Sequence, residues 1–142
     1  EDVDLVAICA QLAARMPPPA GFELFGAPRL CALRSVPVGR AIENLLANAG
    51  RYGSQTLLAL HFEETDLRIA VHDDGPGIPE APREAAAKPF VRLEAARGQN
   101  QGGGVGLGLA IAADVARSHG GQLVLGDSAA LSGLSAEIRL PL

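Results

Sequence analysis

The sequence contains no tryptophan, few aromatic residues and only two cysteines. Aromatic residues make up 4% and hydrophobic residues 48%, so a sizeable core can form and must be mainly aliphatic. Cys9 and Cys31 are too few for a disulfide framework, and their apolar neighbours favour buried free thiols. No apolar run approaches the about 18 residues that a membrane-spanning helix needs, and no signal peptide is recognisable.

The sequence also lacks an excess of positive charge. Its formal net charge is -4 and its pI about 5.3, which argues against binding to nucleic acid. A small anionic ligand remains compatible with this balance, because a few local cations and backbone N–H groups can hold one. The 142 residues correspond to one domain. The chain begins without methionine inside a predicted helix, so we expect it to be part of a longer protein.

The spacing of apolar residues predicts three helices, over 3–16, 37–49 and 107–119. Strands are predicted over 22–24, 29–33, 56–63, 66–72, 122–125 and 134–140. The stretch 79–104 is irregular, and a connection of that length in a compact domain is usually functional or mobile. The order of elements predicts an α+β fold, a two-layer sandwich with helices on one face of a mixed, mostly antiparallel sheet.

The helix over 37–49 has two distinct stripes of residues. One stripe is apolar and is expected to face the sheet, and the other contains Asn44, Asn48, Arg51 and Tyr52. Asparagine is a mediocre helix former, so two of them one turn apart call for a reason. An amide oxygen suits Mg²⁺, which usually binds together with phosphates, and Arg51 is placed to reach a phosphate. A solvated polar helix face explains the same stripe equally well.

Two glycine-containing segments complete the candidate site. Asp73 ends a predicted strand and is followed by Gly75 and Gly77, where a carboxylate can accept a hydrogen bond from the exocyclic amine of adenine. Aspartate and glycine are also common in ordinary turns. The glycine run 102–108 leads into the helix 107–119, whose N-terminus favours an anion. It is neither a dinucleotide fingerprint, since no strand directly precedes it, nor a Walker loop.

The order and spacing of these motifs resemble the ATP-binding catalytic domain of sensor histidine kinases, which shares its nucleotide fold with gyrase, Hsp90 and MutL. NLLANAGRY (44–52) resembles the N box and DDGPGI (73–78) the G1 box. KPFVRLEAARG (88–98) resembles the F box, and GVGLGLAI (104–111) with HGG (119–121) the G2 box. The resemblance covers nearly all of residues 1–142 and implies a single Bergerat-type catalytic domain with a mobile ATP lid at about 79–104.

The resemblance also implies a role for each site residue, with ATP and Mg²⁺ as the bound groups. Asn48 would coordinate Mg²⁺, with Asn44 close by, Arg51 would contact the phosphates and Tyr52 the adenine. Asp73 would accept the adenine amine. Asn44 and Arg97 are the implied catalytic residues. The other implied ATP contacts are Gly75, Gly77, Ile78, Arg92, Arg97, Gly104, Val105, Gly106, Leu107 and Gly108. Val105 departs from the frequent Thr or Ser at its position, which removes one hydroxyl contact.

The kind of ATP chemistry depends on Asn44. The ATPase branches of the fold carry a glutamate general base at this position, and Glu43 points about 100° around the helix from it. Slow hydrolysis is therefore expected, with the γ-phosphate passing instead to a histidine. His61, His72 and His119 do not fit the acceptor motif and are expected to be structural. Alternatives are an anti-sigma-type serine kinase and a degenerate nucleotide-binding adaptor.

The resemblance finally implies partners and a location. A dimerisation and phosphoacceptor domain and sensor segments are expected to lie outside this chain, and the full-length kinase would act on a cognate response regulator. No nucleic acid partner is expected. The isolated domain is expected to be monomeric and soluble, and the full-length receptor to present it at the cytoplasmic face of the inner membrane.

Overall fold

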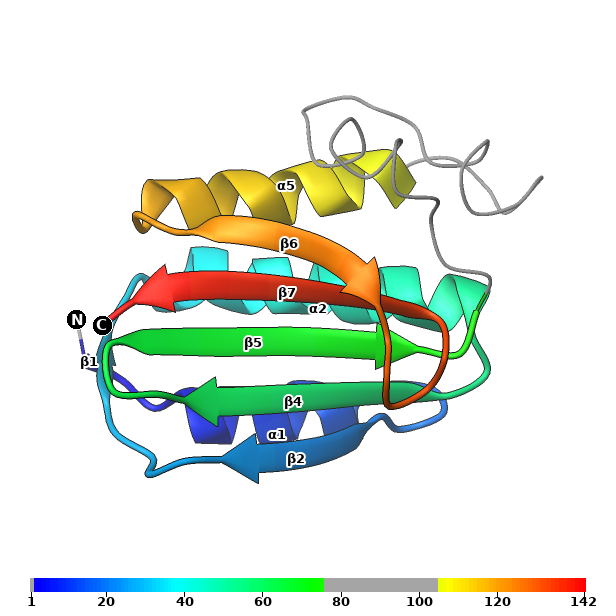
Figure 1. Ribbon diagram of the computed structural model, residues 1–142, viewed down its shortest axis with the longest axis horizontal. Helices are drawn as coiled ribbons and strands as arrows, with labels where there is room; N and C mark the ends of the chain where they lie inside the picture. Colours follow the sequence, from blue (N-terminus) through cyan, green and yellow to red (C-terminus); the bar gives the residue numbers. More distant parts are fainter. Residues whose placement is uncertain (1, 76–104) are drawn as a thin grey trace.

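Three helices lie against one face of a five-stranded sheet in the computed structural model, which describes residues 2–75 and 105–142 (Figure 1). The helices are α1 (Leu5–Ala14), α2 (Ser35–Tyr52) and α5 (Val105–Ser118). The sheet has the order β2-β4-β5-β7-β6. Its strands are β2 (Gly21–Phe25), β4 (Thr56–Phe62), β5 (Asp66–Asp73), β6 (Gln122–Asp127) and β7 (Leu134–Pro141). The predicted α+β two-layer architecture is confirmed.

The sheet is mostly antiparallel, as predicted, with one parallel pair at its edge. Neighbouring strands β4, β5, β7 and β6 pair antiparallel, whereas β2 runs parallel to β4. The predicted alternation along β5 is also confirmed, because Leu67, Ile69 and Val71 are buried in the core. Arg68 and His72 therefore lie on the opposite face, which we call the outer face of the sheet.

The first helix is shorter than predicted at both ends. Asp2–Val3 forms a short strand, β1, which pairs with β3 (Cys31–Ala32) instead of continuing the helix. Asp4 then acts as the N-cap of α1, its side-chain oxygen accepting a hydrogen bond from Ala7 N at 3.1 Å. Only two residues of the strand predicted over 29–33 are extended and paired.

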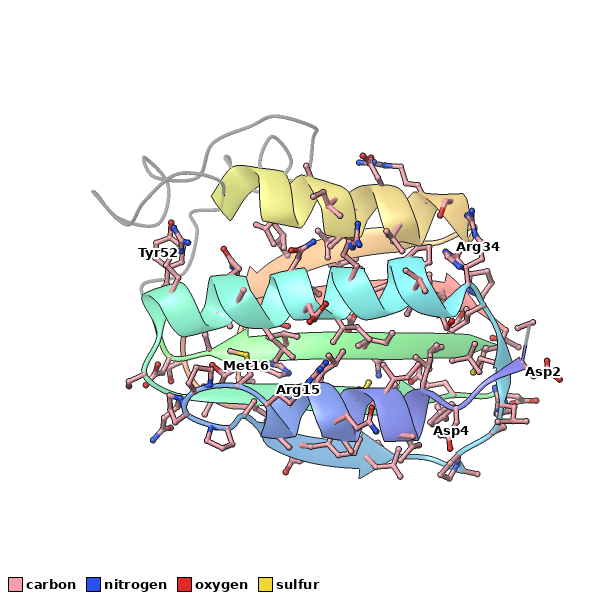
Figure 2. All side chains as sticks on the ribbon, turned by 180° about the vertical axis from the view of Figure 1, so that it is seen from behind. Asp2, Asp4, Arg15, Met16, Arg34 and Tyr52 are labelled. Atoms are coloured by element: carbon pink, nitrogen blue, oxygen red, sulfur yellow. The ribbon has the colours of Figure 1, made fainter. Side chains whose placement is uncertain are left out.

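The second helix is longer than predicted and continues through Gly50 to Tyr52. A Cβ at Gly50 would come within 3.1 Å of Met16 Cε, so the glycine lets the segment after α1 approach the helix (Figure 2). The helix stops at Gly53, whose N–H bonds to Ala49 O at 2.8 Å and whose φ of -118° is extended. Arg51 and Tyr52 consequently remain in helical register with the two asparagines.

The core is aliphatic and includes both cysteines. Cys9 and Cys31 are buried free thiols, and burial raises the pKa of Cys9 to about 12. This confirms their interpretation as small hydrophobic residues. Within residues 2–75 and 105–142, no helix is both long and apolar enough to cross a lipid bilayer.

Candidate functional site

The candidate site lies at the end of the molecule where α2 and β5 finish and α5 begins (Figure 1). Helices α2 and α5 pack directly on each other. A Cβ built on Gly108 would lie 3.8 Å from Asn44 Cβ, so the second turn of α5 passes close to the asparagine stripe of α2. The structure thus brings together two motifs that lie about 60 residues apart in the sequence.

Asn48 carries a polar atom that the described residues leave unsatisfied. The residue is 5% exposed, and its Oδ1 has no hydrogen-bond partner in the described part of the chain. A buried acceptor of this kind costs about 1–3 kcal/mol, and native proteins seldom retain one without a reason. Because Asn48 is buried, the alternative of a solvated polar helix face is wrong for this residue. An amide oxygen in this state fits a hard cation such as Mg²⁺.

The other members of the stripe differ in exposure. Asn44 and Tyr52 are half-buried and Arg51 is exposed. Figure 2 shows Tyr52 at the end of α2. Arg51 is in the last turn of the helix, one turn beyond Asn48. A bound anion can therefore meet the Arg51 charge at the surface while the amide oxygen lies deeper.

Asp73 lies at the end of β5 and is almost fully buried, with 1% of its surface exposed. Its Oδ1 accepts hydrogen bonds from Gly75 N at 2.9 Å and from Leu134 N at 3.1 Å. A side chain at Gly133 would overlap the Asp73 carbonyl oxygen, and its Cβ would lie 2.5 Å from Oδ1. Gly133 and Leu134 were not predicted as site residues, because only the antiparallel neighbour β7 brings them to Asp73.

The adjacent Asp74 joins the turn after β5 to the loop after α2. Its carboxylate accepts Ser54 N at 2.6 Å, Ser54 Oγ at 2.7 Å and Gln55 N at 3.0 Å. The backbone N–H of Gln55, followed by the Ser54 hydroxyl, lowers the pKa of Asp74. A Cβ at Gly53 would lie 2.7 Å from Asp74 Oδ1. We call these hydrogen bonds between Asp74 and residues 54–55 the Asp74 clasp. The sequence did not predict them, because an Asp-Asp pair is common in ordinary polar turns.

Part of the predicted site lies outside the described residues. This applies to Gly77, Ile78, Arg92, Arg97, Gly104 and the lid predicted at about 79–104. Val105, Gly106 and Leu107 form the first turn of α5, and Gly108 follows them in the helix. In the described ranges no three His, Cys, Asp or Glu side chains gather to hold a metal ion. A cation here would depend on the Asn48 amide and on the ligand's own oxygens.

Glu43 lies on a different side of α2 from Asn44, as predicted. Its side chain is 59% exposed, and a carboxylate oxygen lies 3.9 Å from the Arg15 guanidinium of α1. An exposed pair of this kind contributes little stability, but it shows which way the side chain points. Asn44, next to α5, cannot act as a general base because an amide has no basic nitrogen.

The three histidines all have structural contacts. His61 and His72 are on the outer face of the sheet, where His61 stacks on Phe25 with ring centroids 4.5 Å apart. His72 Nδ1 lies 2.9 Å from Ser128 Oγ. His119 directly follows α5. Its Nδ1 lies 2.9 Å from Val115 O of that helix, and its Nε2 accepts a hydrogen bond from Arg34 N, just before α2, at 3.2 Å. Their interpretation as structural residues agrees with these contacts.

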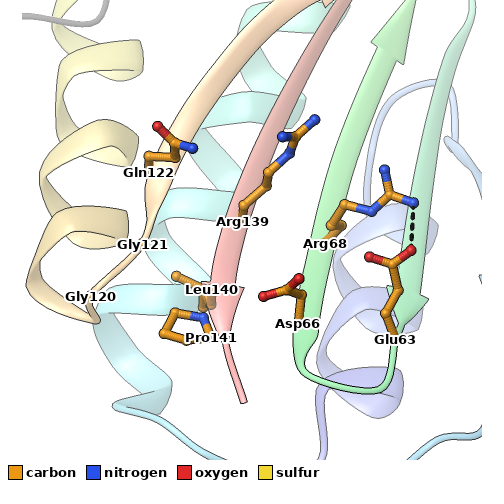
Figure 3. Close-up of a pocket in the computed structure, with 9 residues that line it drawn as sticks. All are labelled: Glu63, Asp66, Arg68, Gly120, Gly121, Gln122, Arg139, Leu140 and Pro141. Carbon is orange, nitrogen blue, oxygen red and sulfur yellow. Dashed lines mark hydrogen bonds and ion pairs between the residues drawn. The ribbon is translucent and has the colours of Figure 1, made fainter.

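A separate cleft lies at the other end of the sheet, away from Asn48 and Asp73 (Figure 3). It has a volume of about 670 Å³ and contains Glu63 and Arg68, which form a hydrogen bond of 2.9 Å. Glu137 pairs with Arg68 at 3.6 Å and with Arg139. These charges balance one another across the outer face, so the cleft shows no preference for a ligand of one sign.

Known proteins resemble the chain along most of its length. Sensor histidine kinase CpxA of Escherichia coli is 40% identical over 127 residues, which span 88% of this chain and 26% of CpxA. Sensor-type histidine kinase PrrB of Mycobacterium tuberculosis is 34% identical over 142 residues, spanning 97% of this chain and 30% of PrrB. The crystal structure of the ATP binding domain of PrrB superposes with a TM-score of 0.75 and 28% identity, covering 99% of this chain and 96% of that one.

The fold is therefore that of the ATP-binding domains of sensor histidine kinases. Residues 34–142 match the family model described as histidine kinase-, DNA gyrase B-, and HSP90-like ATPase, and the chain belongs to this family. The predicted resemblance is confirmed. The chain spans only 26% and 30% of the two curated relatives.

Proposed function

We propose that the chain binds Mg-ATP and donates the γ-phosphate to a histidine on a separate dimerisation domain of a two-component sensor kinase. The observation that carries the proposal is the buried, unsatisfied Asn48 Oδ1 at the same end of the fold as the buried Asp73 carboxylate. One group suits a cation that accompanies phosphates, and the other suits the amine of adenine. Family membership and the sensor kinase relatives support the same activity.

Different described residues would contact the base, the phosphates and the metal ion of the nucleotide. Asp73 would accept the adenine amine, and Tyr52 would lie against the base. Arg51 and the N-terminal turn of α5 would hold the phosphates, because a helix N-terminus and a guanidinium both favour anions. Asn48 would hold Mg²⁺, with Asn44 close by. Bound Mg²⁺ would supply charge neutralisation for the phosphate oxygens.

The chain's contribution to transfer is mainly positioning and charge neutralisation. The lone pair of a neutral imidazole nitrogen forms the new P–N bond as the P–O bond to the leaving ADP breaks. The proton on the other ring nitrogen then passes to a base on the acceptor domain or to water. Water is a poor competitor in this site, because Asn44 supplies no general base and Glu43 points toward Arg15.

The acceptor histidine is proposed to come from outside this chain. His61 and His72 lie on the outer face of the sheet, and His119 lies at the end of α5 opposite the site. None of the three can approach a phosphate held at the N-terminus of α5. A dimerisation domain, a cognate response regulator and a position at the cytoplasmic side of a membrane accordingly belong to the proposed full-length receptor.

The experiment measures phosphate transfer in trans. The chain, Mg-ATP and a separately expressed dimerisation domain from a sensor histidine kinase should yield acid-labile phosphohistidine on that domain. Asn48→Ala should abolish most of the transfer, whereas Glu43→Gln, an exposed change on the same helix, should retain it. Phosphoserine on a partner would favour the serine kinase alternative, and ATP binding without transfer to any histidine domain would favour the adaptor.

A further inference from the structure

The turn between β6 and β7 packs against the end of β5. This turn, residues 128–133, folds across the outer face of the sheet beside the end of β5 and the start of β4 (Figure 1). It is held by its own backbone, since Ser128 N donates to Gly133 O at 2.7 Å and Ser132 N donates to Ser128 O at 2.8 Å. Ser132 has a φ of 70°, a left-handed conformation that closes the turn tightly.

The end of this turn fixes the Asp73 carboxylate. Leu134 N–H donates to Asp73 Oδ1 at 3.1 Å. Gly133 approaches so closely that a Cβ there would lie 2.7 Å from Gly75 N, which also donates to Oδ1. Two donors on one oxygen restrict rotation of the carboxylate about its Cβ–Cγ bond. A shift of the turn would therefore change the direction in which Asp73 presents its oxygens to a base.

The start of the turn is fixed by Ser128 and His72. Ser128 is 3% exposed, and its Oγ accepts Leu131 N–H at 2.9 Å. The same Oγ lies 2.9 Å from His72 Nδ1. Because the backbone N–H already donates to Oγ, the assignment that satisfies every group has the Ser128 hydroxyl donating to Nδ1, with the imidazole proton on Nε2.

Protonation of His72 would disrupt this arrangement. Nδ1 would then carry a hydrogen directed at Oγ, and the serine hydroxyl would lose its acceptor in a buried position. The pKa of His72 lies below its ordinary value, mainly because burial disfavours the charged ring. The positive charge of His61 lowers it further, whereas the carboxylates of Glu137, Glu23 and Asp73 raise it. These are the charged and titratable groups that act on the ring from β2, β4, β5 and β7.

We propose that His72 and Ser128 are positioning residues for adenine recognition, acting through the turn on the Asp73 carboxylate. The proposal rests on the proposed function, since it requires Asp73 to meet the adenine amine. It assigns a role to a histidine and a serine on the opposite side of the sheet from the nucleotide. Neither touches the ligand, so their removal should affect the base contact and spare the phosphate contacts.

The test compares ATP with purine riboside triphosphate, which lacks the exocyclic amine, by titration calorimetry. The quantity measured is the ratio of the two Kd values, about tenfold or more for the wild-type chain, the range expected of a hydrogen bond to a charged group. Ser128→Ala should reduce the ratio to below about threefold while the Kd for purine riboside triphosphate stays unchanged. Ser128→Thr, which keeps the hydroxyl, should restore the ratio. Ser135→Ala, opposite His72 on β7, is the matched control.

A second variant addresses the proton. His72→Asn places a neutral acceptor near the position of Nδ1, so it should keep the ratio at pH 7.5. The wild-type ratio should fall as pH decreases below the ordinary histidine value of 6.5, and the ratio of His72→Asn should not. This variant tests the role of His72 even where Ser128→Ala does not fold.

The outcomes separate the two proposals. A wild-type ratio in Ser128→Ala, or the same pH profile in wild type and His72→Asn, overturns the positioning role while leaving ATP binding intact. An equal rise of both Kd values in Ser128→Ala also overturns it, because that pattern reports a general loss of structure. Absence of ATP binding by the wild-type chain overturns the proposed function and this inference with it.

Discussion

Replacing Asp73 by asparagine should invert the base preference of the site. The amide is isosteric with the carboxylate, and Gly75 N–H and Leu134 N–H both donate to Oδ1. In Asp73→Asn these donors select the orientation with the amide oxygen at Oδ1. The amide nitrogen then takes the Oδ2 position, where it offers N–H donors in place of an acceptor. The amine of ATP, itself a donor, would then meet the amide N–H donor of residue 73, whereas the 6-carbonyl of ITP could accept a hydrogen bond from it.

The size of the effect follows from the loss of one hydrogen bond to a charged group. Such a bond contributes about 1.5–3 kcal/mol, or about 10- to 150-fold in Kd. At an ATP concentration of 100 times Kd, wild-type binding stabilises the fold by about 2.7 kcal/mol, and a 100-fold weaker Kd leaves about 0.4 kcal/mol. For a domain of this length these values correspond to Tm shifts of about 8–9 °C and about 1 °C.

The assay is a thermal melt of both proteins with Mg-ATP, with Mg-ITP and without nucleotide. The Tm of each protein without nucleotide is the reference for its own shifts, and Gly75 N–H and Leu134 N–H keep an acceptor in the variant. ATP should lose most of its effect, and ITP should stabilise the variant more than ATP does. An ATP shift that survives the substitution, or an ITP shift that remains smaller than that of ATP, would refute the assigned role of Asp73.

Two further predictions concern stability. Gly133→Ala should lower the Tm by about 3–10 °C, because the added Cβ meets backbone atoms and overpacking costs about 1–3 kcal/mol. The control is Gly126→Ala on β6, where a Cβ meets nothing within 4 Å, and it should leave the Tm unchanged or raise it slightly. Equal effects of the two changes would contradict the steric argument. Backbone hydrogen bonding lowers the pKa of Asp74, so its contribution to stability is present above the ordinary value of 3.8 and lost as pH falls through the lowered value. The Tm difference between wild type and Asp74→Ala should therefore be largest near neutral pH and shrink in acid, and a difference independent of pH would count against the clasp.

Periodicity was sufficient to predict the layers of the fold. The alternation of Leu67, Ile69 and Val71 with polar residues identified β5 and its buried face. The i, i+4 spacing of Asn44 and Asn48 placed both on one side of α2. These patterns are local, so a single sequence contains them. The burial of Asn48 depends on what packs around the helix, and the sequence left a solvated face as an equal alternative.

Long-range pairing could not be predicted in the same way. The parallel pairing of β2 with β4 and the short β1–β3 sheet join segments whose sequences do not indicate a partner. Gly50 resembles a helix terminator, yet α2 continues through it, and Met16 packs where a side chain of residue 50 would stand. Gly133 and Leu134 become part of the site only through the register of β7 against β5. Position in space, rather than residue type, gives these residues their role.

The far end of α5 is anchored by close contacts to the neighbouring segments. His119 accepts the Arg34 N–H at 3.2 Å, Gly120 turns with a φ of 80°, and a Cβ on Gly121 would overlap the Arg139 carbonyl. The helix has 14 residues and is about 21 Å long. A tilt of about 5° about the anchored end would displace the first turn by about 2 Å, close to the H···O distance of a hydrogen bond. In the proposed nucleotide complex, such a tilt would move the phosphate-facing turn of α5 while the anchored end keeps its contacts.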